Sequence, residues 1–331
     1  MIFETLATTA GLLGARELVH QAILRGLRAP RVPHQLNAAD LGLAPDRLHR
    51  TRIPGPRGRN LSAWLVMPPG HERGGPGGPD GPGGPHGLVG AAQPGEPVPA
   101  VLVMHGWGGN AAMMAPVVPP LHAAGMAVLL LDARCHGHSD GEAFTSMPRF
   151  AEDIAAGLAW LRRQPGIDGR RLALIGHSVG AAASLLHASR HHDVRAVASL
   201  SSFAHPQEVM RRFMADKRVP YPVLGWYVLR HVQRVIGHTF DAIAPLHTIT
   251  RLRCPVLLVH GLQDRTVPFD DARRLQAASA DARLLPVTGD HDLREALMPH
   301  ADQLVDFLKR ALASPAWAEN PLIQSSSAQR C

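Results

Sequence analysis

The stretch of sequence that decides the fold is RLALIGHSVGAAASLLHAS, residues 171–189. An apolar run over 172–175 predicts a buried strand, and the alanine-rich run after Gly180 predicts a helix. Ser178 stands at the junction, between Gly176 and Gly180. A strand that turns sharply into a helix strains the turn residue, and side chains beside it would collide unless they were glycine. The two glycines therefore predict that the Ser178 hydroxyl lies exposed at the carboxyl edge of a sheet, near a helix N-terminus.

Strands and helices alternate along most of the chain. Its 331 residues are 45% hydrophobic, enough to bury the core of one large α/β domain or two modest ones. Because the strand runs are continuously apolar and helix-like segments separate most of them, we expect a mostly parallel sheet covered on both faces. The expected strands are 46–53, 61–67, 100–104, 126–131, 171–175, 194–200, 255–260 and 283–287.

The ends of the chain lie outside this alternation. Residues 1–45 predict an amphipathic helix, from about Leu6 to Leu27, followed by a linker. We interpret this helix as packed on the domain, with a membrane-surface anchor as the alternative. The core domain is expected over 46–312, and 313–331 predict a disordered polar tail.

Two long connections interrupt the core. Residues 69–99 contain GGPGGPDGPGGPHG, in which glycine entropy and the missing proline N–H oppose regular structure, so we expect a surface loop far from the chemistry. Residues 203–250 are too long for a simple crossover and predict an inserted helical cap, whose side chains we expect to shape the substrate pocket. The cap is basic, which indicates a solvated face or, alternatively, attraction to anionic substrates or a lipid surface. Its basic residues are Arg211, Arg212, Lys217, Arg218, Arg230 and Arg234.

A serine hydroxyl needs a base, and the base needs an acid to orient it. Asp264 follows the strand 255–260, and His291 follows the strand 283–287. Ser178, Asp264 and His291 follow one another in the order nucleophile, acid, histidine, which is one of the known chain orders of a catalytic triad. An oxyanion formed at Ser178 would need two N–H donors, and we expect those of Val179 and of Trp107 in the glycine-rich HGWGGN.

Five motifs together resemble the α/β-hydrolase superfamily, particularly its bacterial serine esterases and prolyl-oligopeptidase-like hydrolases. They are HGWGG, DARCHGHSDGE, GHSVG, HGLQD and GDHD, and the resemblance covers roughly residues 46–312 apart from the Gly/Pro-rich insertion. It implies an eight-stranded sheet, catalysis through an acyl-enzyme, and neither metal nor cofactor. One departure is Cys135, where relatives usually carry glycine; it bears on local loop shape more than on chemistry.

We interpret the chain as a serine hydrolase that cleaves small carboxylic esters. Two alternatives stay open: a peptidase or amidase that uses the same residues, and a non-catalytic binding protein that retains the fold. A dinuclear metal site at His136, His138 and Asp140 is a weaker hypothesis, because residue 141 is glycine where a further histidine should follow. Asp290 and Asp292 compete with Asp264 to orient the histidine.

Composition and charge indicate which partners and which cellular compartment to expect. The formal net charge is +7, but the arginines are scattered, so a nucleic-acid partner is not expected. The three cysteines, Cys135, Cys254 and Cys331, are widely spaced and odd in number, which indicates neither a disulfide framework nor a zinc site and favours a reducing compartment. Neither a signal peptide nor a membrane span is expected, so the predicted location is cytoplasmic. The oligomeric state is not predicted.

Overall fold

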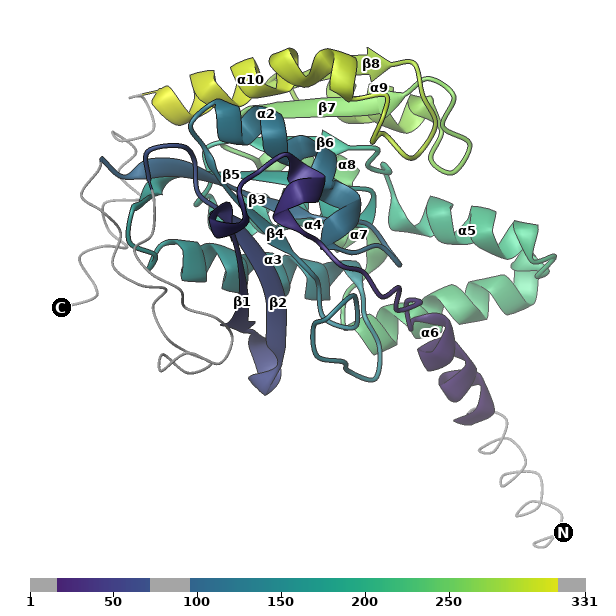
Figure 1. Ribbon diagram of the computed structural model, residues 1–331. Coiled ribbons are helices and arrows are strands. Elements are labelled where there is room, and N and C mark those ends of the chain that lie inside the picture. Colours follow the sequence, from purple (N-terminus) through teal and green to yellow (C-terminus); the bar gives the residue numbers. More distant parts are fainter. Residues whose placement is uncertain (1–16, 72–95, 315–331) are drawn as a thin grey trace, which may run out of the picture.

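An eight-stranded sheet forms the centre of the computed structural model, which describes residues 17–71 and 96–314 (Figure 1). Its strand order is β1-β2-β4-β3-β5-β6-β7-β8. The β1–β2 and β2–β4 pairs are antiparallel, and every pair from β4–β3 onward is parallel. The predicted eight-stranded, mostly parallel sheet is therefore confirmed. The strands are β1 Leu48–Pro54, β2 Asn60–Val66, β3 Val98–Met104, β4 Ala127–Leu131, β5 Ile167–His177, β6 Val197–Leu200, β7 Val256–Gly261 and β8 Ala282–Val287.

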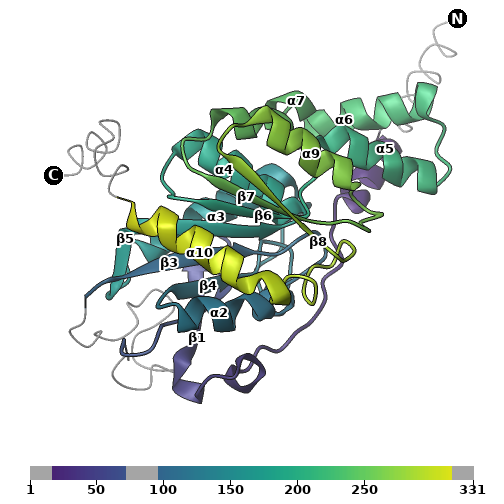
Figure 2. The same cartoon turned by 90° about the horizontal axis from the view of Figure 1, so that it is seen from above.

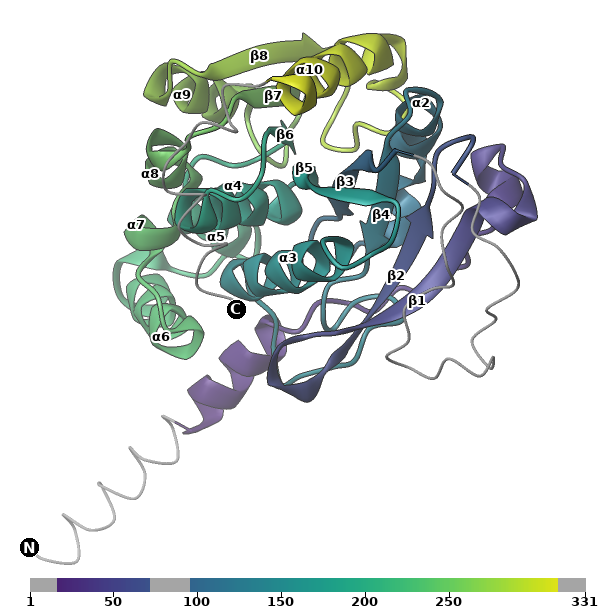
Figure 3. The same ribbon diagram turned by 90° about the vertical axis from the view of Figure 1, so that its left-hand side faces the viewer.

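Helices cover both faces of the sheet, as the apolar strands predict (Figure 3). One buried cluster lies between the sheet and a layer that includes α3, α4 and α9, and a second lies between the sheet and α2 and α10. Because both faces are buried, the central strands carry apolar residues at nearly every position. The helices are α2 Val118–Ala123, α3 Met147–Leu161, α4 Val179–His191, α5 Pro206–Asp216, α6 Trp226–Ile236, α7 Phe240–Ile243, α8 Pro245–Thr248, α9 Phe269–Ala278 and α10 Ala301–Ala313.

Several element boundaries differ from those expected. β5 has 11 residues and begins at Ile167, because its first part pairs with β3 across a register shift. β3 accordingly begins at Val98, inside the range 69–99 that we expected to be a loop. Most of that expected loop, residues 72–95, lies outside the described part of the chain, as do residues 6–16 of the expected first helix and 315–331 of the expected tail.

The connection from β6 to β7 contains α5, a short π-helical segment Tyr221–Gly225, α6, α7 and α8. α5 and α6 form an antiparallel pair that extends away from the sheet, which we call the α5–α6 hairpin, residues 206–236 (Figures 1 and 2). A helix over 17–26 packs on it, and Ile23 joins a small apolar cluster with hairpin residues such as Met214 and Leu229. Within residues 17–71 and 96–314, no helix combines the length and the apolar character that crossing a bilayer requires.

Candidate active site

The turn between β5 and α4 has the strained geometry that its glycines predict. Ser178 has φ 53° and ψ −116°, a conformation that few residues other than glycine adopt. A Cβ atom on Gly176 would lie 2.4 Å from the carbonyl oxygen of Gly180, and one on Gly180 would lie 2.3 Å from the carbonyl oxygen of His105. Both positions therefore exclude any larger side chain, and the turn leaves Ser178 at the carboxyl end of a central strand.

Three side chains from separate turns form one chain of hydrogen bonds. Nε2 of His291 lies 3.0 Å from Oγ of Ser178, and its Nδ1 lies 2.7 Å from Oδ2 of Asp264. Asp264 follows β7 and His291 follows β8, and these parallel strands end at the same edge of the sheet as β5. The structure thus brings together the serine, histidine and aspartate that the sequence analysis singled out.

Asp264 is held as a carboxylate. Burial alone would raise its pKa, but hydrogen bonds from His260, His291 and the Val267 N–H outweigh burial and hold the pKa of Asp264 well below its usual range. Oδ1 accepts the N–H groups of Thr266 and Val267 at 2.9 and 2.8 Å. An ionised Asp264 keeps the proton of His291 on Nδ1, which leaves Nε2 free to accept the hydroxyl proton of Ser178.

His260 is one residue that sequence reasoning missed. It ends the apolar run of β7 and is buried, with Nε2 2.9 Å from the carbonyl oxygen of Val267 and 3.3 Å from Oδ2 of Asp264. Because a carbonyl only accepts, that nitrogen carries a proton, and the N–H points toward the loop that holds Asp264. The available signal was a histidine at the end of a strand, four residues before an acid.

His177 lines the cavity, and its contact with the loop after β8 was not predicted, because a histidine at this position was interpreted as merely tolerated. Its Nε2 donates to the carbonyl oxygen of His291 at 2.8 Å, which ties the loop after β8 to the turn that carries Ser178. Burial lowers the pKa of His177 to about 4, so the ring is neutral near pH 7. A Cβ atom on Gly106 would lie 3.0 Å from Nδ1 of His177, so the glycine-rich loop passes directly over this ring.

The two expected oxyanion donors come from the residue after Ser178 and from the loop after β3. Val179 is the first residue of α4, where a helix leaves its N–H without an intrahelical partner. Trp107 belongs to the loop after β3, and within the described residues its N–H is not used in any backbone hydrogen bond. Trp107 and Ser178 both line the same cavity. Two backbone donors are therefore available close to the serine.

Comparison with known proteins agrees with this geometry. The sequence model of the serine aminopeptidase S33 family matches residues 95–236. The esterase Pf2001 of Pyrococcus furiosus superposes with a TM-score of 0.62 at 19% identity, over 86% of this chain and 100% of that one. This chain has the α/β-hydrolase fold.

Two further relatives of this chain are bacterial. It is 32% identical over 197 residues to an uncharacterised protein of Mycobacterium tuberculosis, a match that covers 59% of this chain and 63% of the relative. It is 24% identical over 240 residues to the esterase YjfP of Escherichia coli, which covers 65% of this chain and 90% of that one. The chain thus spans less than two thirds of the length of its mycobacterial relative.

The cavity at Ser178 has a volume of about 350 Å³ and is mostly apolar. One wall comes from the segment after β3 and the other from the loop after β8. Among the side chains that the structure describes, none from the α5–α6 hairpin or the rest of 203–250 lines it, so the expectation that the cap shapes this pocket is wrong. The physical reason is that α5 and α6 extend outward, away from the sheet (Figure 1). The apolar lining residues are Met113, Met114, Pro116, Val117, Leu200, Leu293 and Leu297.

The loop after β4 supports the glycine-rich loop that follows β3. Burial lowers the pKa of His136 to about 3, and its neutral Nε2 accepts the N–H of Gly108 at 3.1 Å. His138 and Asp140, the other members of the hypothetical metal motif, contact the carbonyl of His34 and the side chain of Arg52. The described ranges contain no cluster of three or more metal-ligating side chains.

Cys135 lies in the same loop and has φ 67°, the left-handed region that favours glycine. This conformation suits the glycine that the resemblance implies at this position. In this chain the thiol lies 3.7 and 3.8 Å from the carbonyl oxygens of Glu142 and Phe144. The Cys135 side chain, which departs from the family pattern, therefore has contacts within its own loop.

Proposed function

We propose that this α/β-hydrolase is a serine hydrolase that cleaves carboxylic esters with an apolar acyl group. The observation that carries the proposal is the continuous hydrogen-bonded chain Ser178–His291–Asp264 at the mouth of an apolar cavity. The esterases among its relatives and structural neighbours support the same reaction class.

In the proposed reaction, Oγ of Ser178 attacks the ester carbonyl while Nε2 of His291 takes the hydroxyl proton. Asp264 stabilises the imidazolium, and the N–H groups of Trp107 and Val179 bind the oxyanion, an interaction typically worth about 3 to 4 kcal/mol per donor. His291 then returns the proton to the departing alkoxide, which leaves an acyl-enzyme. Water, deprotonated by His291, attacks that acyl group. The bond from the acyl carbon to Oγ of Ser178 then breaks, Oγ takes the proton back from His291, and the acid is released.

These side chains and water account for every bond and proton in both half-reactions. The proposal therefore includes no metal and no cofactor, and we expect hydrolysis to continue in the presence of a chelator.

The cavity walls favour an apolar acyl group over a charged one. Among the described residues, the acids that line it are Asp290 and Asp292, and the carboxylate of Asp292 is paired with the guanidinium of Arg294. Oδ1 of Asp290 accepts the N–H of Asp292. An uncharged acyl chain can instead bury its surface against the methionines and leucines of the walls.

A peptidase or amidase with the same residues is the second candidate, which the S33 aminopeptidase match favours. An aminopeptidase must bind the α-ammonium group of its substrate. The α5–α6 hairpin contributes no acid to the cavity, which favours the esterase. Hydrolysis of an ester and of the anilide with the same acyl group separates the two: we expect kcat/KM for the ester to exceed that for the anilide at least tenfold, a difference of about 1.4 kcal/mol.

The decisive experiment labels the protein with a fluorophosphonate, which reacts with an activated serine. We expect labelling and p-nitrophenyl ester hydrolysis in the natural chain and neither in Ser178→Ala. The matched control is Ser184→Ala, on the same helix, whose hydroxyl donates to the carbonyl of Gly180 and does not line the cavity. A folded natural chain that reacts with neither reagent would support the non-catalytic binding protein.

We also infer that the enzyme acts in the cytoplasm on small molecules, without a nucleic-acid partner. The inference rests on the scattered arginines and on cysteines at Cys135 and Cys254 that are unpaired. Fractionation of cells that express the tagged chain would test the location.

A further inference from the structure

The outer end of the α5–α6 hairpin exposes large apolar side chains. The side chain of Phe213 is 62% exposed, that of Trp226 is 55% exposed and that of Leu224 is 47% exposed. Phe213 lies near the end of α5, and the other two lie where the chain turns into α6. These residues are therefore far from the sheet, at the end of the hairpin that projects furthest from it (Figures 1 and 2).

The packing of the hairpin does not require these three side chains. The small core between the hairpin and the helix 17–26 is made by other residues, including Ile23, Met214, Leu229, Val232 and Phe240. The exposed side chains are thus additional apolar surface on an element that is already anchored. Exposed aromatic residues grouped in this way indicate a contact surface.

Basic residues surround this apolar end. Exposed bases on residues 206–236 outnumber exposed acids five to one, the acid being Asp216. Within the described residues none of the five forms an ion pair, whereas the less exposed Glu208 and Arg212 are paired with residues of α9. The five exposed bases are Arg211, Lys217, Arg218, Arg230 and Arg234.

Three of these cations lie over aromatic rings. Nζ of Lys217 is 5.8 Å from the ring centre of Phe213, and the guanidinium of Arg230 is 5.7 Å from that of Trp226. The guanidinium of Arg211 lies 4.0 Å from the ring of Tyr221. Each apolar ring therefore has a cation beside it, the combination that suits a boundary between hydrocarbon and anionic head groups.

We propose that the end of the α5–α6 hairpin docks this protein on the surface of an anionic lipid bilayer. Phe213, Leu224 and Trp226 would enter the boundary between head groups and acyl chains, and the flanking arginines and lysine would bind lipid phosphates. A second copy of the chain is a poorer occupant, because two copies would bring the same unpaired positive charges together.

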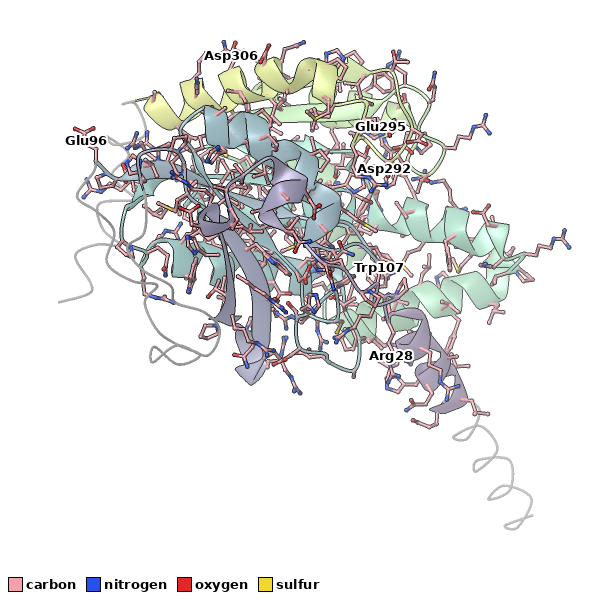
Figure 4. All side chains as sticks on the ribbon, in the orientation of Figure 1. Arg28, Glu96, Trp107, Asp292, Glu295 and Asp306 are labelled. Carbon is pink, nitrogen blue, oxygen red and sulfur yellow. The ribbon has the colours of Figure 1, made fainter. Side chains whose placement is uncertain are left out.

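The docked orientation would also place the cavity toward the lipid. The hairpin extends from the side of the molecule on which Trp107 and Asp292 lie, and both residues line the cavity at Ser178 (Figure 4). This second part rests on the proposed function, since it implies that the esters are membrane-partitioned. Docking itself does not depend on any catalytic activity, so the two proposals fail separately.

The test is sedimentation of the full chain with vesicles of phosphatidylcholine, with and without about one third phosphatidylglycerol. We expect the natural chain to bind the anionic vesicles at least tenfold more tightly than the neutral ones, and to lose most of this binding at high salt. Phe213→Ser/Trp226→Ser and Lys217→Glu/Arg230→Glu should each weaken binding at least tenfold. The matched control is Lys309→Glu/Arg310→Glu on α10, which reverses two exposed charges far from the hairpin and should bind like the natural chain.

Thermal unfolding of every variant shows whether it is folded, so that lost binding reports on the surface. Equal binding to neutral and anionic vesicles, or equal loss in the α10 control, would overturn the proposal. So would self-association in analytical ultracentrifugation that Phe213→Ser/Trp226→Ser abolishes, combined with no vesicle binding. In that case the hairpin would be an interface between copies of the chain.

Discussion

The edge of the sheet at Ser178 and the outer end of the α5–α6 hairpin differ in whether their polar and charged groups have partners within the protein. At the sheet edge, the side chains of Ser178, His291 and Asp264 each have a partner within hydrogen-bond distance, and Asp264 is buried. At the outer end of the hairpin, arginines and aromatic rings are exposed. These exposed arginines form no ion pair within the described residues. Groups that are held in one geometry can transfer protons, whereas exposed and unpaired groups are available to bind another surface. Substitutions should separate the two regions by their effects.

The largest effect is expected from Asp264→Asn. An amide at this position favours the wrong tautomer of His291, so kcat for a soluble ester should fall about 10⁴-fold, or about 5.5 kcal/mol. Asp290→Asn is the matched control, because Asp290 has an adjacent backbone N–H as its partner and should change kcat only a few-fold. Steady-state kinetics on the purified variants measure both. Near-normal turnover in Asp264→Asn, with loss in Asp290→Asn or Asp292→Asn, would mean that another acid orients the histidine.

The next effect concerns stability in acid. The pKa of His177 is lowered from 6.5 to about 4 in the folded chain, so between these values the unfolded chain binds a proton that the folded chain does not. The free energy of unfolding should therefore fall as pH drops from about 6.5 to 4, by up to about 3 kcal/mol from this group.

Urea unfolding of the natural chain and of His177→Gln, which cannot titrate, measures this contribution as the change in their difference with pH. A difference that stays constant over the window would contradict the assignment. The lowered pKa of Asp264 acts in a separate window, because its stabilisation is lost only as pH falls below about 3.8.

A smaller effect should follow from filling the cavity. Met113 lines it, and Met113→Trp should reduce the ratio of kcat/KM for a long acyl chain to that for acetate about tenfold, or about 1.4 kcal/mol. The control is Leu224→Trp at the hairpin, which adds the same ring where no cavity residue lies. A panel of p-nitrophenyl esters provides the measurement. An unchanged ratio in Met113→Trp with a changed one in Leu224→Trp would assign the acyl pocket to the hairpin.

The smallest effect is expected at the end of the hairpin. Phe213→Ser/Trp226→Ser should change the free energy of unfolding by less than about 0.5 kcal/mol per substitution, because surface positions outside a core contribute little. Activity on a soluble ester should stay within a few-fold of the natural chain. Chemical denaturation and ester kinetics check both. A large loss of stability would show that these rings belong to the folded core.

Much of the fold could be predicted because its causes are local. Continuous apolar runs predicted the central strands, and Gly176 and Gly180 predicted the turn at Ser178. The clash that excludes a side chain at Gly176 is local, with the backbone of Gly180, whereas the clash at Gly180 is with the backbone of His105 after β3. The strand ends then predicted where Asp264 and His291 would lie. Element boundaries such as the start of β3 at Val98 were missed, because they depend on pairing with residues of β5 far along the chain.

The sequence by itself therefore determined the order of the elements, the identity of the nucleophile candidate and the residue types that could serve it. Only the tertiary structure decided which groups meet: His177 and His260 contact the loops that hold His291 and Asp264, and residues after β3, not the hairpin, wall the cavity. The physical reason is that a turn is governed by sterics over a few residues, whereas the direction of a side chain and the position of a helical hairpin depend on packing between segments distant in sequence.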